Sequence, residues 1–165
     1  MCSGGGCSSG VERCCVSADF SAIAVGDEVR GRHRFTAEEV DAFARLSGDM
    51  NPMHVDAAFA RTTRFKRPVV HGMLSAAHLW ALIGRRLQGN GFLCLQQQVE
   101  FPVPLFVGDE VEFTLRVEHK SVATRTFIVR VEGRNEDNAI VLKGKATVLP
   151  IDSEASDPSS GGGAR

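Results

Sequence analysis

The sequence lacks three features that would each indicate a particular class of protein. No run approaches the roughly 18 to 20 consecutive apolar residues that a membrane-spanning helix needs, so no membrane partner is expected. The formal net charge is only -1, which gives no general attraction to nucleic acid. Four of the five cysteines precede residue 16, and only Cys94 lies in a segment patterned like a folded element. A core built on disulfides is therefore not expected.

What the sequence does have is the composition of one globular domain. Its 165 residues are 43% apolar and 24% charged, which suits a single hydrophobic core. Residues 1–22 are rich in Ser, Gly and Cys, and residues 151–165 combine acidic residues with Ser, Pro and Gly. We expect both to be disordered tails around a folded domain at residues 23–150. The first tail is patterned neither as a secretory signal nor as a good organelle presequence, so secretion is not expected.

The folded segment predicts a mixed α and β structure. A short strand is expected at residues 27–35, and Thr36 is a plausible N-cap for a helix that ends at Gly48. Residues 71–87 predict a long helix that is apolar on nearly every side and must be covered. From residue 92 the pattern alternates with period two through four runs separated by turns. The predicted fold class is α+β, with an antiparallel sheet wrapped around one long central helix.

One segment, SGDMNPMHVD at residues 47–56, places an aspartate and a histidine five residues apart between helical patterns. Pro52 is favoured at the first position of a helix, and Asn51 before it is a good N-cap, so NPMHVDAAFAR predicts a second short helix that begins at Pro52. His54 then lies in the first turn, where the helix dipole disfavours a charged ring and leaves it able to accept a proton. Asp49 lies on the preceding turn, so the two side chains can meet. Local chemistry alone favours a capping aspartate and a structural histidine over an acid–base pair.

Three stretches of the chain, FARLSGDMNPMHVDAAFA, VVHGML and VEFPVPLFVGDEV, resemble the MaoC-like family of R-specific enoyl-CoA hydratases and (R)-3-hydroxyacyl-thioester dehydratases. The resemblance runs from about residue 27 to 149, and the Ser-Gly-Asp-x-Asn-Pro-x-His core is specific to that family. The layout is especially similar to the mitochondrial type 2 3-hydroxyacyl-thioester dehydratases of fatty-acid synthesis. The resemblance implies a hot-dog fold that dimerises, in agreement with the predicted helix within a sheet.

The same resemblance implies a hydro-lyase that interconverts trans-2-enoyl and (R)-3-hydroxyacyl thioesters of coenzyme A or acyl carrier protein, without a metal or redox cofactor. Asp49 and His54 would be the catalytic pair, Asn51 would assist, and the backbone N–H of Gly72 would face the thioester oxygen. Removal of a C2 proton builds enolate charge on that oxygen, which a donor at the start of a helix can stabilise. The resemblance also implies a homodimer in the mitochondrial matrix, with the cytoplasm as the alternative.

Other functions stay open at this point. Residues 71–88 contain no Asp or Glu, whereas many hot-dog thioesterases place a catalytic carboxylate on the central helix, so an acyl thioesterase is disfavoured. A non-catalytic acyl-thioester-binding subunit would be free to lose the four residues named above. A metal site of His54, His71 and His78 is a further alternative, but the sequence has no HExxH motif and no Cys/His pair at zinc spacing.

A basic segment follows the motif. In ARTTRFKRP, four cations fall within seven residues: Arg61, Arg64, Lys66 and Arg67. The phosphates of coenzyme A, or the acidic surface of a carrier protein, would suit such a patch. A solvated loop is equally consistent with the charge spacing, but the position beside the motif favours substrate binding.

Overall fold

A computed structural model describes residues 20–86 and 91–151 of the chain. The elements in chain order are η1 (Phe20–Ala22), β1 (Glu28–Arg34), α1 (Ala37–Ser47), α2 (Pro52–Val55), α3 (Ala57–Thr62), α4 (Gly72–Arg86), β2 (Phe92–Glu100), β3 (Glu110–Ser121), β4 (Thr126–Asn135) and β5 (Ile140–Pro150). No helix within the described ranges is long and apolar enough to cross a membrane.

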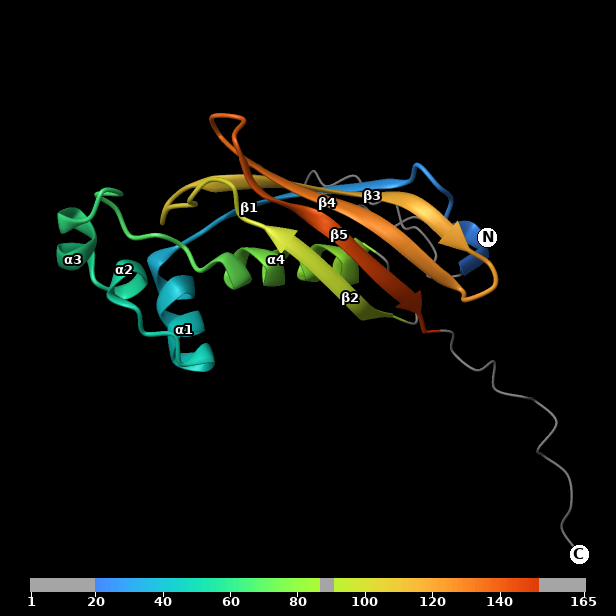
Figure 1. Cartoon of the computed structure of the whole chain (residues 1–165), viewed down its shortest axis with the longest axis horizontal. Coiled ribbons are helices and arrows are strands. Elements are labelled where there is room, and N and C mark those ends of the chain that lie inside the picture. The colour runs from blue at the N-terminus through green and yellow to red at the C-terminus, as the bar shows by residue number, and fades with distance from the viewer. Residues whose placement is uncertain (1–19, 87–90, 152–165) are drawn as a thin grey trace, which may run out of the picture.

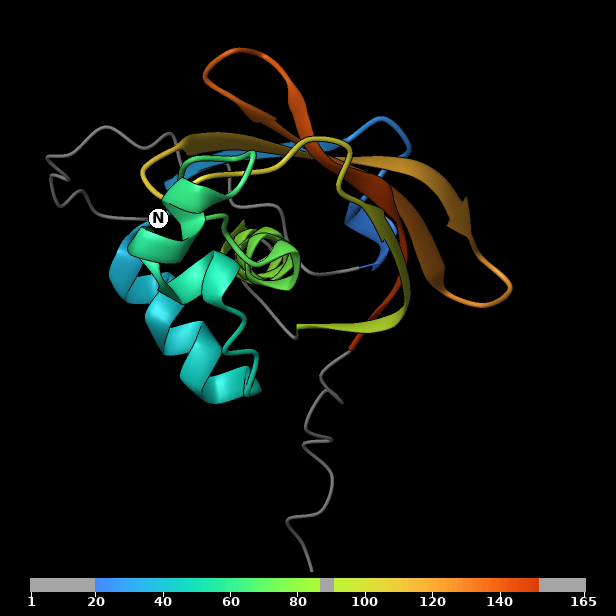
Figure 2. The same cartoon turned by 60° about the vertical axis from the view of Figure 1, so that its left-hand side comes forward.

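The five strands form one antiparallel sheet in the order β1-β3-β4-β5-β2. Helix α4 lies along the concave side of this sheet, and the three short helices α1, α2 and α3 gather at one end of α4 (Figure 1). Figure 2 looks nearly along α4 and shows the sheet curving around it. The predicted α+β class and the hot-dog arrangement of a helix wrapped by a sheet are confirmed.

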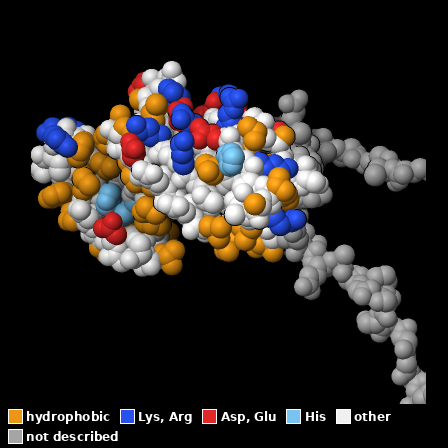
Figure 3. Space-filling model, turned by 45° about the vertical axis from the view of Figure 1, so that its right-hand side comes forward, with side chains coloured by type: hydrophobic (Ala, Val, Ile, Leu, Met, Phe, Trp, Pro, Cys, Tyr) orange, Lys and Arg blue, Asp and Glu red, His pale blue; other side chains and the backbone are white. Residues whose placement is uncertain are grey.

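The core lies between α4 and the inner face of the sheet. Strand β3 alternates strictly at its start, so Val111, Phe113 and Leu115 are buried while their neighbours face outward. Leu79 of α4 is fully buried against this face, and burial of a side chain of this size contributes about 1.5 to 3 kcal/mol. On the outer face, basic and acidic side chains are interleaved, as the upper part of Figure 3 shows.

Helix α4 is less buried than its pattern predicts. Met73, Ala77 and Ala81 are exposed at a spacing of four residues, which places them in one stripe along the helix. The sheet covers only one side of α4, so a single chain leaves this apolar stripe open. The exposed apolar side chains of Leu93 and Leu95 lie on β2, the strand at one edge of the sheet.

The folded region begins earlier than the sequence predicts. Residues 20–22 fall in the expected N-terminal tail, yet Phe20 is buried in the core and its ring lies 4.9 Å from that of Phe127. The physical reason is that one aromatic side chain provides enough apolar surface to hold a tail segment against the sheet. The rest of the two predicted tails lies outside the described residues, apart from Ile151.

Candidate active site

The loop that carries Asp49 is set by the end of α1. Gly48 has a φ of 79°, and its N–H donates to the carbonyl of Ala44 at 2.9 Å, so the helix ends in a left-handed residue that favours glycine. Asp49 therefore lies outside α1, on the loop that follows it. Its N–H donates to Ser47 Oγ at 3.2 Å, and its Oδ1 accepts from the N–H of Asn51 at 3.3 Å. About half of the Asp49 side chain, 54%, is exposed.

Helix α2 places His54 as the sequence predicts. It begins at Pro52, and Asn51 caps it by accepting the N–H of Met53 at 3.1 Å. His54 Nδ1 lies 2.6 Å from the carbonyl oxygen of Val69. A carbonyl oxygen only accepts, so Nδ1 carries a hydrogen. In the neutral ring the lone pair is then on Nε2, the nitrogen that is left to accept a proton.

The second helix of the motif is broken where the sequence suggests a continuous one. Helix α2 ends at Val55 and α3 starts at Ala57. Asp56 separates them, because its carboxylate accepts the N–H groups of Ala58 and Phe59 at 2.8 and 3.0 Å. An aspartate in an extended conformation is a strong N-cap, and here it starts a new helix.

Asp49 and His54 come together, with His71 as a third partner. One carboxylate oxygen of Asp49 and one ring nitrogen from each histidine lie within 4.8 Å of one another. The His54 and His71 rings are stacked, with centroids 3.8 Å apart and planes at 26°. His71 immediately precedes Gly72, the first residue of α4, so the unpaired N–H groups at the start of this helix lie next to the cluster.

Gly72 is constrained more tightly than its sequence context reveals. A Cβ atom at this position would lie 2.9 to 3.1 Å from three ring atoms of Phe101. The loop after β2 therefore packs against the start of α4, and only glycine fits without a shift of the ring. Nothing in the local sequence around Gly72 indicates a partner 29 residues later.

The four cations of the basic segment divide into two kinds. Arg67 donates to the carbonyl of Val107 at 3.0 Å and to Asp109 Oδ1 at 2.8 Å. It therefore fastens the basic segment to the turn just before β3. All four side chains are exposed, but no hydrogen bond or ion pair is observed among the described residues for the side chains of the other three: Arg61, Arg64 and Lys66. Within the described ranges, none of the four is bonded to Asp49 or His54. The structure therefore does not bring the segment into contact with the predicted catalytic pair.

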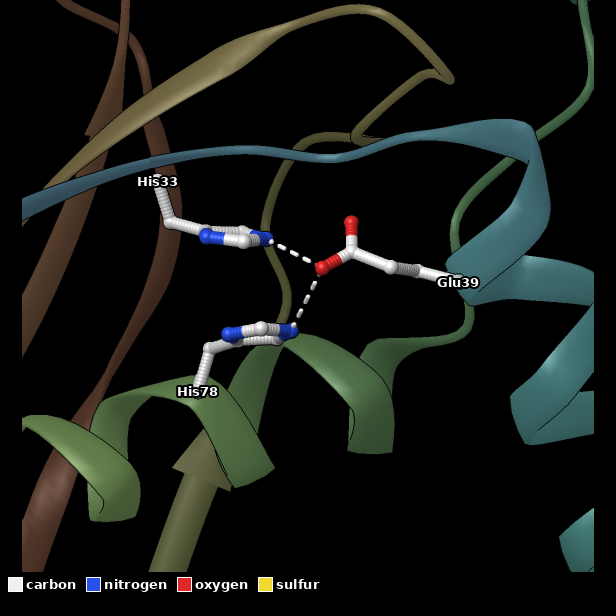
Figure 4. A group of neighbouring side chains, drawn as sticks. All are labelled: His33, Glu39 and His78. Carbon is white, nitrogen blue, oxygen red and sulfur yellow. Dashed lines mark ion pairs between the residues drawn. The ribbon is translucent and has the colours of Figure 1, made fainter.

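The histidines considered as a metal site fall into two separate groups. His54 and His71 stack on each other. His78 instead stacks on His33, with ring centroids 3.7 Å apart, and the rings of His33 and His78 both face Glu39 (Figure 4). Imidazole ligates through a lone pair in the ring plane. Each stacked pair, together with one carboxylate, places its ligand atoms within 4.8 Å of one another, with Asp49 beside the first pair and Glu39 beside the second. His54, His71 and His78 therefore do not form one common site.

The group of His33, Glu39 and His78 was not predicted from the sequence. Glu39 Oε1 lies 2.9 Å from His33 Nε2 and 3.5 Å from His78 Nε2. Burial would raise the pKa of Glu39, but the N–H of Thr36 and the two imidazoles hold it below its ordinary value. The three residues come from β1, α1 and α4, and no short-range spacing could have revealed their meeting.

An apolar pocket lies away from this cluster. It is lined by residues from the start of the fold and from all five strands, among them Ile23, Val29, Phe92, Leu115, Phe127 and Val148. None of the predicted site residues lines it.

With the geometry described, the comparisons with known proteins decide the family. Residues 21–138 match the family model for the MaoC like domain. The chain belongs to the MaoC-like family. An (R)-specific enoyl-CoA hydratase of Aeromonas caviae is 45% identical to this MaoC-like chain over 130 residues, which cover 76% of the chain and 94% of the relative. A mitochondrial 3-hydroxyacyl-[acyl-carrier-protein] dehydratase of Arabidopsis thaliana is 30% identical over 143 residues, covering 81% and 85%.

Solved structures of MaoC-like relatives have the same fold. The (R)-hydratase from A. caviae involved in PHA biosynthesis superposes with a TM-score of 0.74 at 41% identity, covering 77% of this chain and 96% of that one. An unliganded R-hydratase from Pseudomonas aeruginosa gives a TM-score of 0.76 at 31% identity, covering 81% and 86%.

Proposed function

We propose that this MaoC-like chain is a hydro-lyase that interconverts trans-2-enoyl and (R)-3-hydroxyacyl thioesters, with Asp49 and His54 as its acid–base pair. The observation that carries the proposal is the meeting of a carboxylate oxygen of Asp49 and a ring nitrogen of His54 within 4.8 Å, beside the start of α4. Family membership and the similarity to named hydratases and dehydratases support it. The reaction takes place in fatty-acid metabolism.

The two side chains divide the proton transfers. In dehydration, His54 Nε2 accepts the C2 proton, because Nδ1 already donates to Val69. Asp49 delivers a proton to the departing C3 hydroxyl, which leaves as water. In hydration the steps reverse, so the pair deprotonates water for attack at C3 and returns a proton to C2. The N–H of Gly72 stabilises the enolate charge that builds on the thioester oxygen.

Asn51 assists through both the oxygen and the NH2 group of its side-chain amide. Its side-chain oxygen is committed to the N–H of Met53, so the cap holds the start of α2 and with it His54. The amide NH2 group then remains as a donor on the exposed side. We propose that this group orients the water or the C3 hydroxyl.

Arg61, Arg64 and Lys66 are proposed to bind the phosphates of the thioester carrier, either coenzyme A or the phosphopantetheine of a carrier protein. All four cations of the segment are exposed, but Arg67 is already bonded to Val107 and Asp109, so the role falls to the other three. A phosphate-binding role predicts that substitution raises KM more than it lowers kcat, and that the difference shrinks at high salt.

The proposal includes a homodimer and a compartment. The exposed apolar stripe on α4 and the exposed leucines of the edge strand β2 supply a surface that a second copy would cover. A mitochondrial matrix location is supported by the similarity to mitochondrial dehydratases, while the relatives of higher identity are bacterial. Subcellular fractionation against matrix and cytosolic markers tests this part.

The first experiment follows the loss of enoyl-thioester absorbance with short-chain trans-2-enoyl-CoA, and assigns the product with a stereospecific dehydrogenase. We expect the (R)-3-hydroxy product, and we expect the rate to fall by ~10²-fold or more in Asp49→Ala and in His54→Ala. Asp41→Ala and His119→Ala are matched controls, because both residues are exposed and lie outside the cluster; their rates should match the unsubstituted enzyme. Release of free thiol would instead indicate a thioesterase, and binding without turnover a non-catalytic subunit.

A further inference from the structure

His71 is a buried histidine that the proposed reaction does not use. Only 3% of it is exposed, and among the described residues it is one of two buried polar side chains, with Ser75. Its carbonyl accepts the N–H groups of Leu74 and Ser75 at 3.0 and 3.3 Å. The main chain of His71 is thereby fixed to the first turn of α4, and its ring projects from a rigid base.

The ring of His71 reaches the main chain of the Asp49 loop. Its Nε2 lies 3.0 Å from the carbonyl oxygen of Asp49 and 3.9 Å from a carboxylate oxygen of the same residue. Because a carbonyl oxygen can only accept, Nε2 carries a hydrogen and donates it. The hydrogen bond joins the loop after α1 to the start of α4, across 22 residues of sequence.

The other nitrogen of the ring, Nδ1, has no hydrogen-bond partner among the described residues. It is buried, and a buried polar atom without a partner destabilises a fold. A residue that merely filled this space would avoid that penalty with an apolar side chain. The presence of histidine is therefore explained by the contacts that its Nε2 and its ring face make.

The ring face supports the proposed base. The His54 ring lies on the His71 ring at 3.8 Å, while its own Nδ1 is held by Val69. One hydrogen bond leaves an imidazole free to rotate about the bond axis, and a flat surface against one face restricts that rotation. The contact fixes the direction in which His54 Nε2 points.

We propose that His71 is a positioning residue that sets both members of the acid–base pair, through Nε2–H to the main chain of Asp49 and through its ring face to His54. The inference rests on the proposed roles of Asp49 and His54. The buried side chain of His71 then determines where Asp49 and His54 lie relative to each other, although the two residues come from different segments. Displacement of a reacting group by about 1 Å can reduce a rate by 10²-fold, so loss of this support should lower kcat.

Two variants separate the two contacts. His71→Phe keeps a flat ring under His54 and removes the donor to Asp49, whereas His71→Gln keeps an N–H donor at a similar reach and removes the ring. We expect each to lower kcat by ~10-fold or more with KM changed by less than about twofold. We expect the effect of His71→Phe to shrink in an Asp49→Asn background, because residues that act through one another are not additive.

The matched control is His33→Phe. His33 is also stacked on a second histidine, at 3.7 Å from His78, and also faces a carboxylate (Figure 4), but it lies outside the Asp49 cluster. The chemical change is identical, so a general effect of losing a stacked histidine would appear in both variants. We expect His33→Phe to alter thermal stability and leave kcat unchanged.

A measurement on the unsubstituted protein completes the test. In ¹⁵N spectra of labelled histidine, we expect His71 to be the Nε2–H tautomer and His54 the Nδ1–H tautomer. An Nδ1–H tautomer for His71 would overturn the proposal even if no variant folds. Folded His71→Phe and His71→Gln proteins with unchanged kcat and KM would also overturn it. Full activity in Asp49→Ala or His54→Ala would instead reject the proposed function.

Discussion

Gly72 illustrates how one residue can serve two requirements. Its N–H is the proposed donor to the thioester oxygen, and its missing side chain leaves room for the Phe101 ring. We expect Gly72→Ala to destabilise the fold by about 1 to 3 kcal/mol, as overpacking of a close contact does, and to lower kcat by moving the donor. Thermal unfolding and steady-state kinetics measure both effects, and adding Phe101→Leu should restore part of the lost stability.

The control for this substitution lies in the same helix. A Cβ at Gly84 would meet no atom within 4 Å, so Gly84→Ala changes helix propensity without a clash. It should leave the stability unchanged or raise it by about 0.5 to 1 kcal/mol. Equal stability losses in Gly72→Ala and Gly84→Ala would contradict the role given to the Phe101 contact.

At the residue scale, the sequence predicted what depends on neighbours along the chain. Asn51 caps α2, and His54 lies in its first turn, because a cap and a proline act over a few residues. The sequence did not predict the contact of His71 with Asp49 or that of Phe101 with Gly72. These contacts join segments 22 and 29 residues apart, and they exist only after the sheet has placed both segments.

At the scale of elements, Glu39 joins α1 to β1 and α4. Its Oε2 accepts the N–H of Thr36 at 2.9 Å, which completes a capping box at the start of α1, and its Oε1 faces His33 and His78. The pKa of Glu39 is lowered in the fold, so the ionised carboxylate stabilises the native state. That stabilisation is complete above the ordinary value of 4.5 and is lost as the pH falls through the lower, folded pKa.

Glutamine can still accept the N–H of Thr36, so Glu39→Gln removes only the charge, and we expect it to lower the free energy of unfolding at neutral pH by roughly 0.3 to 1 kcal/mol. The difference from the unsubstituted protein should narrow as the pH falls below 4.5 and through the lower pKa of folded Glu39, because the protonated glutamate is then neutral, as glutamine is at every pH. Urea unfolding across this pH range measures it. Asp41→Asn, on an exposed position of α1, should give no comparable difference, and a pH-independent effect of Glu39→Gln would reject the electrostatic explanation.

The elements themselves were largely predictable, with two instructive exceptions. The period of the apolar residues indicated α1, α4 and the strands after residue 91, and the order of these elements is confirmed. The break at Asp56 was missed, because a capping aspartate and an exposed helical aspartate look alike in a sequence. The sequence also did not predict the exposed stripe of α4. An apolar helix face that the sheet leaves exposed has the same pattern of residues as a helix face that is buried.

At the scale of the whole molecule, the exposed apolar surface predicts the assembly state. Leu95 lies on the edge strand β2 and is 51% exposed. If a second copy covers this surface, Leu95→Glu buries a charge in the interface and should convert a dimer into a monomer in light scattering after size exclusion. Val122→Glu is the control, because Val122 is 76% exposed in the turn between β3 and β4. A monomeric unsubstituted protein would reject the homodimer.

The sheet order is the part of the whole-molecule arrangement that the sequence could not supply. Strands β3, β4 and β5 pair in chain order, as short turns require. Strand β1, however, pairs with β3, and β2 pairs with β5. Both pairings depend on the path of α4 along the concave side of the sheet, and alternating side chains do not specify which strand lies beside which.

The segment that carries Asp49 and His54, the proposed acid–base pair, is held mainly by hydrogen bonds to backbone atoms. His54 donates to the carbonyl of Val69, and the N–H of Val69 donates to the carbonyl of Met53. His71 faces the carbonyl of Asp49. Every residue type provides a carbonyl, so the side chains at positions 53 and 69 can drift during evolution without removing these acceptors.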